Sequence, residues 1–157
     1  MIYVECKPDE TLVKALGISG KVIEHRSGKG SVCKRLEESI NSKGLVDEDP
    51  LSAQPSYIKK LTLRSQKHDI KLLYDENAKN YLIMLCANLE EWILKATKDA
   101  EINIKNYNLP DNIDELHKIL NTKIGKFTNL LQNLKKKKSR LLKTLEDFVK
   151  NKQHILK

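Results

Sequence analysis

Cysteine, aromatic side chains and long apolar runs are all scarce in this sequence of 157 residues. Its three cysteines, Cys6, Cys33 and Cys86, are odd in number and form no CxxC pair, which argues against a disulfide framework and against a zinc site. No stretch approaches the roughly 18 apolar residues that span a bilayer, and charge appears early, at Glu5 and Lys7. We therefore expect a cytoplasmic protein with no membrane partner.

The low aromatic content, 5%, also weighs against one mode of nucleic-acid binding. Proteins that stack single-stranded bases interleave aromatic and basic residues, and no such pattern is present here. Hydrophobic residues nevertheless make up 39% of the chain, which is enough for one core and argues against wholesale disorder. The length fits one domain with an appendage.

The net charge of +8 is concentrated in the last third of the chain. Residues 111–157 contain 12 Lys and Arg against 5 Asp and Glu, whereas the first 110 residues contain 17 against 16. Such a segment either faces a polyanion, with nucleic acid as the expected partner, or is a solvated helix surface. The candidates for gripping phosphates are Lys135, Lys136, Lys137, Lys138 and Arg140.

Short apolar runs alternate with helical patterns through the first hundred residues. We expect strands at 2–4, 21–24, 44–46, 70–73 and 81–85, a short helix at 57–65, and longer helices opened by Pro8, Ser31 and Asn88. This alternation is typical of an α/β fold in which helices flank a mainly parallel sheet. Residues 1–105 are thus expected to form one α/β domain.

The remaining residues, 106–157, are expected to form a basic helical extension. Apolar residues recur at steps of three and four from Ile113 to Leu134 and again from Leu141 to Val149, and a lysine run separates the two stretches. Asn112 resembles the start of a capping box. This pattern predicts two or three helices that hairpin near the lysine run and pack on the domain or on a partner.

Acidic residues follow two of the predicted strands. Glu5 ends the first, and Asp47 and Asp49 follow the third. In a parallel sheet these ends meet at one edge, and in an extended segment Asp47 and Asp49 point to the same side, away from Glu48. Three such carboxylates would repel one another unless a cation such as Mg²⁺ or Mn²⁺ lay among them. The alternative is an acidic loop that caps the next helix.

A glycine-rich stretch follows the second predicted strand. Gly28, Lys29 and Gly30 are expected to form a loop that leads into a helix capped by Ser31, where amide groups and a lysine suit a phosphate. The GxxxxGK[ST] spacing of a Walker A loop is absent. An ordinary glycine turn remains the alternative.

Two short motifs resemble the Toprim family over roughly residues 1–100. Val4-Glu5-Cys6-Lys7-Pro8-Asp9 resembles the Toprim opening "VEGKxD", and Leu45-Val46-Asp47-Glu48-Asp49-Pro50 resembles its DxD motif. The resemblance implies that Glu5 is a general acid or base and a ligand, that Asp47 and Asp49 bind metal, and that Asp9 assists. Leu89-Glu90-Glu91-Trp92 resembles an "E-x-W" helix of small Toprim-like proteins, which implies Glu90 as an outer carboxylate; a surface acid is the alternative.

The sequence departs from the family at Cys6, where glycine is usual, and it has no tyrosine placed as a topoisomerase nucleophile. What the resemblance implies is a nuclease that depends on Mg²⁺ or Mn²⁺ and works beside a separate ATPase. The competing hypothesis is a non-catalytic module that forms a homo-oligomer or binds a partner through its C-terminal helices.

Overall fold

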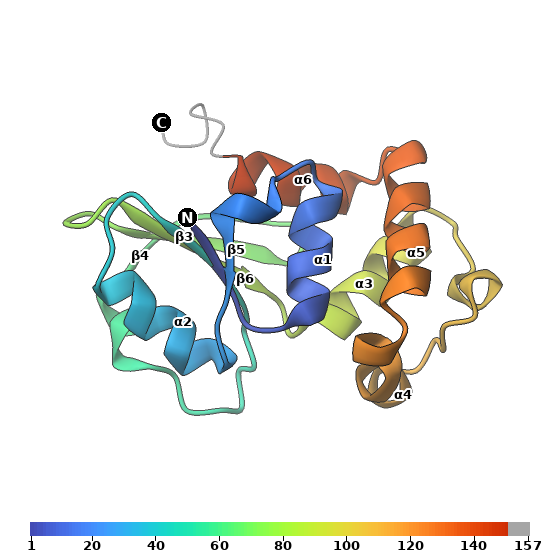
Figure 1. The fold of residues 1–157 in the computed structure, drawn as a ribbon, viewed down its shortest axis with the longest axis horizontal. Coiled ribbons are helices and arrows are strands. Elements are labelled where there is room, and N and C mark those ends of the chain that lie inside the picture. The colour runs from blue at the N-terminus through green and yellow to red at the C-terminus, as the bar shows by residue number, and fades with distance from the viewer. Residues whose placement is uncertain (151–157) are drawn as a thin grey trace.

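A computed structural model describes residues 1–150 of the protein. It shows a six-stranded sheet with helices on both faces (Figure 1). The strands lie in the order β2-β1-β3-β6-β5-β4. Their bounds are β1 Ile2–Val4, β2 Ile23–His25, β3 Lys43–Asp47, β4 Thr62–Lys67, β5 Ile70–Asp75 and β6 Asn80–Leu85. The α-helices are α1 Lys7–Ala15, α2 Gly28–Glu37, α3 Leu89–Asp99, α4 Ile113–Ile119, α5 Ile124–Lys136 and α6 Arg140–Val149. Short 3₁₀ helices are η1 Gly20–Val22, η2 Ser56–Lys60, η3 Ile104–Tyr107 and η4 Leu120–Thr122.

The sheet is parallel where the acidic motifs lie. β1 pairs in parallel with β2 and β3, and β3 pairs in parallel with β6. β5 and β4 then add to β6 as antiparallel strands. The predicted fold class, α/β with a mainly parallel sheet and C-terminal helices, is therefore confirmed.

Each face of the sheet has its own hydrophobic cluster. α2 covers one face, where Val32 and Leu36 pack with Val46 of β3. A Cβ at Gly44 would lie 2.8 Å from Val32 Cγ1, so only glycine lets α2 approach β3 this closely. On the opposite face lie α1, α3 and the C-terminal helices (Figure 1).

The C-terminal helices share the larger cluster with the sheet. Phe127, Leu130 and Leu134 of α5 are buried in the same cluster as Leu45 and Ile83 of the sheet. α5 also lies against α1 (Figure 1). The division at residues 105 and 106 remains a prediction, and residues 151–157 of the extension lie outside the described part. None of the helices described is both long and apolar enough to span a membrane.

The predicted helix at 57–65 and the predicted start of the second strand were wrong. Residues 57–65 do not form one helix, because η2 ends at Lys60 and the edge strand β4 follows. β4 is mostly polar and exposed, so it lacks the apolar alternation of a half-buried strand.

The turn that joins β4 to β5, His68-Asp69, has positive φ at both residues, as a type I′ turn requires, but it lacks the usual Asn-Gly signature. The second strand begins at Ile23 rather than Lys21, because η1 occupies Gly20–Val22.

Candidate metal centre

Five carboxylate side chains gather at the edge of the sheet where the parallel strands end. Glu5 directly follows β1, and Asp47 is the last residue of β3. Asp9 lies in the first turn of α1, which follows β1, and Glu90 lies in the first turn of α3, which follows β6. Asp49 is close enough for its charge to raise the pKa of Asp47 and of Glu5. Because β1, β3 and β6 run in the same direction, their following segments share this edge.

Hydrogen bonds link the first and third strands directly. The backbone N–H of Asp47 donates to Glu5 Oε2 at 2.6 Å. The Asp47 side chain in turn accepts from the N–H of Leu89, the first residue of α3, at 2.9 Å. α3 is further capped by Asn88, whose side chain accepts from the N–H of Glu91. One oxygen of Glu5 and one of Asp47 thus lock three elements of the site together.

Asp9 is the most unusual member of the group. Its side chain is only 1% exposed, and neither carboxylate oxygen has a donor in normal hydrogen-bond geometry within the described residues, although the Cys6 thiol and the Glu5 backbone lie close enough to lower its pKa. Burial, and then the charge of Glu5, raises its pKa to about 8. A buried carboxylate that no donor satisfies costs stability and calls for a ligand or a function.

The pKa of Asp47 reports how closely the acids lie. This pKa is raised to about 8, most of all by burial and then by the charges of Asp9, Glu5, Glu90 and Asp49, in that order. Burial also raises the pKa of Glu5, although the bond from the Asp47 N–H opposes it. The charges of the other four acids therefore all act on Asp47.

Asp49 departs from the expected geometry. The segment from Asp47 to Asp49 does not stay extended, because β3 ends at Asp47 and Asp49 has a φ of +41°. The reason is that the Asp49 N–H bonds to the carbonyl of Ala87 while its own carbonyl accepts from Ser52 N–H in a turn. Glu48 does not belong to the acid cluster, and its side chain forms an ion pair with Lys71 at 2.5 Å.

The donor set suits a hard divalent cation, but its ligand atoms do not yet converge. Carboxylate oxygens are the ligands that Mg²⁺ and Mn²⁺ prefer, and Asp9 has two oxygens without partners. Among residues 1–150, however, no three His, Cys, Asp or Glu side chains are placed to hold a metal ion as they stand. Glu5 and Asp47 each direct one oxygen at a backbone N–H instead. Binding would therefore require these side chains to turn toward Asp9.

Two histidines border the cluster, and sequence spacing did not identify one of them, His117, as a neighbour of it. His117 of α4 lies with Nδ1 3.5 Å from Glu90 Oε1. Glu90 itself is only 7% exposed, so the alternative prediction, that Glu90 is a surface acid, was wrong. The His25 ring, Nε2, is 3.1 Å from the Glu5 carbonyl. Only the fold, which brings α4 beside α3, places His117 here.

Cys6, where the resembling family has glycine, does not strain the site. It precedes α1 with φ of −154° and ψ of 171°, an extended conformation that any residue adopts. Burial raises the pKa of its thiol, so the thiol stays protonated at neutral pH.

The glycine-rich stretch is helical rather than a loop. Gly28, Lys29 and Gly30 form the first turn of α2, and Ser27 rather than Ser31 precedes the helix. The Lys29 ammonium donates to the Glu48 carbonyl at 2.7 Å and to Gln54 Oε1 at 2.9 Å. The lysine therefore fastens the loop after β3, which leaves less of its charge for a phosphate.

The predicted phosphate-gripping residues lie away from the acids. Lys135 and Lys136 end α5, Lys137 and Lys138 form the turn, and Arg140 begins α6, where it pairs with Asp99 at 2.5 Å. Figure 1 shows this junction at the opposite end of α1 from the loop that follows β1. α1 has nine residues, so the separation is about 13 Å or more at 1.5 Å per residue.

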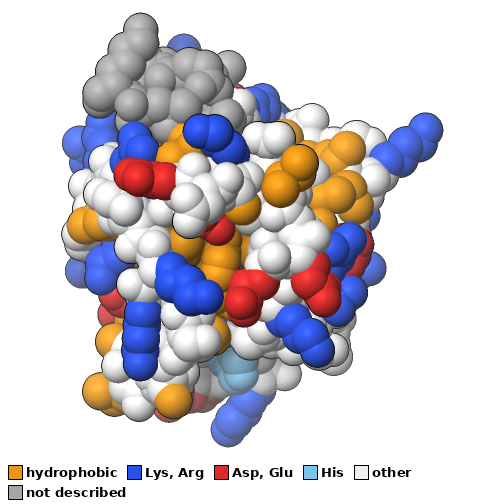
Figure 2. All heavy atoms as spheres, turned by 90° about the vertical axis from the view of Figure 1, so that its left-hand side faces the viewer, with side chains coloured by type: hydrophobic (Ala, Val, Ile, Leu, Met, Phe, Trp, Pro, Cys, Tyr) orange, Lys and Arg blue, Asp and Glu red, His pale blue; other side chains and the backbone are white. Residues whose placement is uncertain are grey.

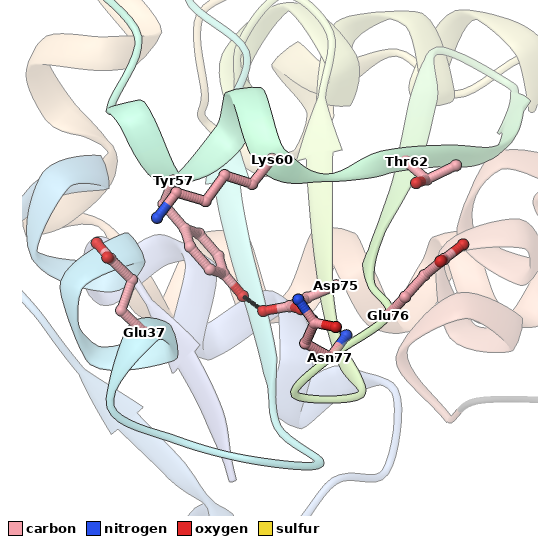
Figure 3. A pocket seen from close by; sticks show the side chains of 7 residues that line it. All are labelled: Glu37, Tyr57, Lys60, Thr62, Asp75, Glu76 and Asn77. Atoms are coloured by element: carbon pink, nitrogen blue, oxygen red, sulfur yellow. Dashed lines mark hydrogen bonds between the residues drawn. The ribbon is translucent and has the colours of Figure 1, made fainter.

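A separate polar pocket lies at the other edge of the sheet (Figure 3). It has a volume of about 320 Å³, and Tyr57 and Asp75 meet in it through a hydrogen bond of 2.8 Å. Asp75 also accepts from the N–H groups of Asn77 and Ala78, so it serves the β5–β6 turn. This pocket contains no unsatisfied buried acid like Asp9 among the described residues.

Comparisons with known proteins return nothing: no family model, no curated protein and no solved structure matches the chain.

Proposed function

We propose that this protein, as a Toprim-like domain, binds Mg²⁺ or Mn²⁺ at the acidic edge of its sheet and hydrolyses phosphodiester bonds in nucleic acid. The observation that carries the proposal is the unsatisfied, fully buried Asp9 carboxylate within a cluster of four other acids. A structural acid would have hydrogen-bond donors, whereas a ligand or catalytic acid need not have them before its partner binds.

The geometry supports distinct roles for the acids. Asp47, Asp49 and Asp9 would hold the cation, with Glu90 at the outer side of the group. A divalent cation bound there would polarise the phosphate and lower the pKa of an attacking water. Before metal binds, Glu5 accepts a hydrogen bond from the N–H of Asp47, and burial raises its pKa, which suits a group that takes up and releases a proton.

The competing function, a module that assembles through its C-terminal helices, has less support. It was motivated by the apolar stripe that begins at Ile113. Most of that stripe, including Leu131, Leu134 and Leu145, is fully buried inside the fold, so it is not free to meet a partner. A separate ATPase partner and a homo-oligomer remain predictions.

Cleavage assays with labelled DNA and RNA, single- and double-stranded, test the proposal. We expect cleavage by the wild type with Mn²⁺ or Mg²⁺, none in EDTA, and none by Asp47→Ala. Asp111→Asn is a matched control, because Asp111 is an exposed acid paired with Lys105 away from the cluster. A wild type that binds the metal yet leaves all four substrates intact contradicts hydrolysis.

A further inference from the structure

A groove between α1 and α5 begins at the N-terminal end of α1. It has a volume of about 480 Å³, and α1 and α5 form its two walls. Its polar lining consists of Lys7, Thr11, Lys14, Thr128, Gln132 and Lys135. Lys7 stands two residues after Glu5 in the sequence, so one end of the groove lies at the N-terminal end of α1, the helix that follows β1.

The far end of the groove meets the lysine run. Lys135 lines the groove and is also the first of the four consecutive lysines. It lines a second hollow of about 330 Å³ between α5 and α6, together with Lys138, Lys143 and one acid, Glu146. The two hollows therefore share a wall and extend the lysine-lined surface past the end of α5.

The charge of the groove has one sign. No Asp or Glu is among its lining residues in the described part of the chain, and its three lysines are exposed. Lys14 pairs with Glu10 at 2.8 Å, but exposed i,i+4 pairs are weak and leave the ammonium free to meet another anion. By contrast, the face shown in Figure 2, toward α2 and β4, has basic side chains interspersed with acidic and hydrophobic ones.

We infer that the groove holds the sugar-phosphate backbone of one nucleic-acid strand and guides it from the lysine run to the acidic cluster. This inference rests on the proposed function, since it names the path by which the substrate reaches that site. Lys7, Lys14 and Lys135 neutralise successive phosphates, and the hydroxyl and amide groups of Thr11, Thr128 and Gln132 offer hydrogen bonds to them.

The lining also sets the kind of recognition. None of the residues that line the groove is aromatic, so bases are not stacked there. The groove is a surface hollow of about 480 Å³ along two helices, which suits a single strand rather than a duplex. Binding should therefore be independent of sequence and strongly dependent on salt.

Fluorescence anisotropy in EDTA measures this binding without cleavage. The probe is a labelled single-stranded oligonucleotide, titrated at salt concentrations from about 50 to 200 mM. The test variant is K7Q/K14Q/K135Q, and the matched control is K34Q/K59Q/K67Q, which removes the same charge from exposed residues of α2, η2 and β4. Single-stranded contacts contribute about 0.7 each to the slope of log K against log [salt], so the groove variant should lose about 2 from that slope. At about 50 mM salt its affinity should fall at least tenfold, and the control should stay near the wild type.

Equal slopes for the groove variant and the control would overturn the path. So would competition by polyglutamate that equals competition by unlabelled oligonucleotide, because the groove would then not distinguish nucleic acid from acidic protein. If the triple variant fails to fold, Lys7→Gln and Lys135→Gln singly should each lose about 0.7 from the slope. A wild type that binds with the expected slope but never cleaves contradicts only the hydrolysis. A wild type that cleaves while the groove variant binds normally contradicts only the path.

Discussion

Metal-free protein should lose stability as the pH rises from 5 to 7, and Asp9 should cause much of the loss. Burial, then the charge of Glu5, raises the pKa of this side chain to about 8, whereas an unfolded aspartate titrates near 3.9. Between these values the folded protein retains a proton that the unfolded chain has released. The unfolded state thus binds fewer protons, and the free energy of unfolding falls with rising pH.

The size of the effect follows from the same shift. Within this window one such group lowers the free energy of unfolding by about 1.4 kcal/mol per pH unit, or by roughly 3 kcal/mol between pH 5 and pH 7. Asp47 has a pKa raised to about 8 as well, by burial and then by the charge of Asp9, so the two titrate as a coupled pair. Asp9→Asn should therefore flatten the pH dependence by about this amount.

Urea denaturation in EDTA at a series of pH values measures the slope for the wild type, Asp9→Asn and the exposed control Asp111→Asn. The control should follow the wild type. Mn²⁺ should restore the stability of the wild type at pH 7, because a ligand that binds only the folded state stabilises it, and should do much less for Asp9→Asn. Identical slopes for the wild type and Asp9→Asn would refute the reasoning.

Three further substitutions test how the site is supported, each by urea denaturation. Gly44→Ala should cost about 1–3 kcal/mol, because its Cβ would lie 2.8 Å from Val32 Cγ1; a neutral effect would contradict the close packing of α2 on β3. Phe127→Ala should cost about 3–5 kcal/mol in a single cooperative transition, since this fully buried ring belongs to the cluster shared with the sheet; separate transitions would contradict one core. Asn88→Ala should cost about 1 kcal/mol through the lost cap of α3, and it should weaken Mn²⁺ binding because Glu90 is then misplaced. The control is Asn112→Ala, which removes the equivalent cap of α4. It should cost similar stability but leave the affinity for Mn²⁺ nearly unchanged.

Local signals in the sequence were sufficient to predict the elements that build the acidic edge. β1 is placed as expected, and β3 and β6 each begin one residue before their expected start, because buried strands of a parallel sheet read as short apolar runs. Asn88 and Asn112 both cap helices where their spacing predicted caps. The meeting of Glu5 with Asp47 then followed from strand direction alone.

Features that depend on tertiary contacts were not predictable from the sequence. Asp49 leaves the extended conformation because its N–H bonds to Ala87, which is distant in sequence. The contact between His117 and Glu90 depends on how α4 folds back beside α3. β4 lacked a signal because, as an exposed edge strand, it needs no apolar alternation. The burial of Asp9 likewise becomes visible only when α1 is placed against the sheet.

The most direct test of the metal centre is an anomalous difference map at the manganese edge from crystals soaked in Mn²⁺. We predict a peak among the carboxylates of Glu5, Asp9 and Asp47, at about 2.0–2.2 Å from at least one oxygen of Asp9 or Asp47, with both side chains turned toward it. An empty acidic edge at saturating Mn²⁺, with Glu5 and Asp47 still bonded to their backbone N–H groups, would contradict the account.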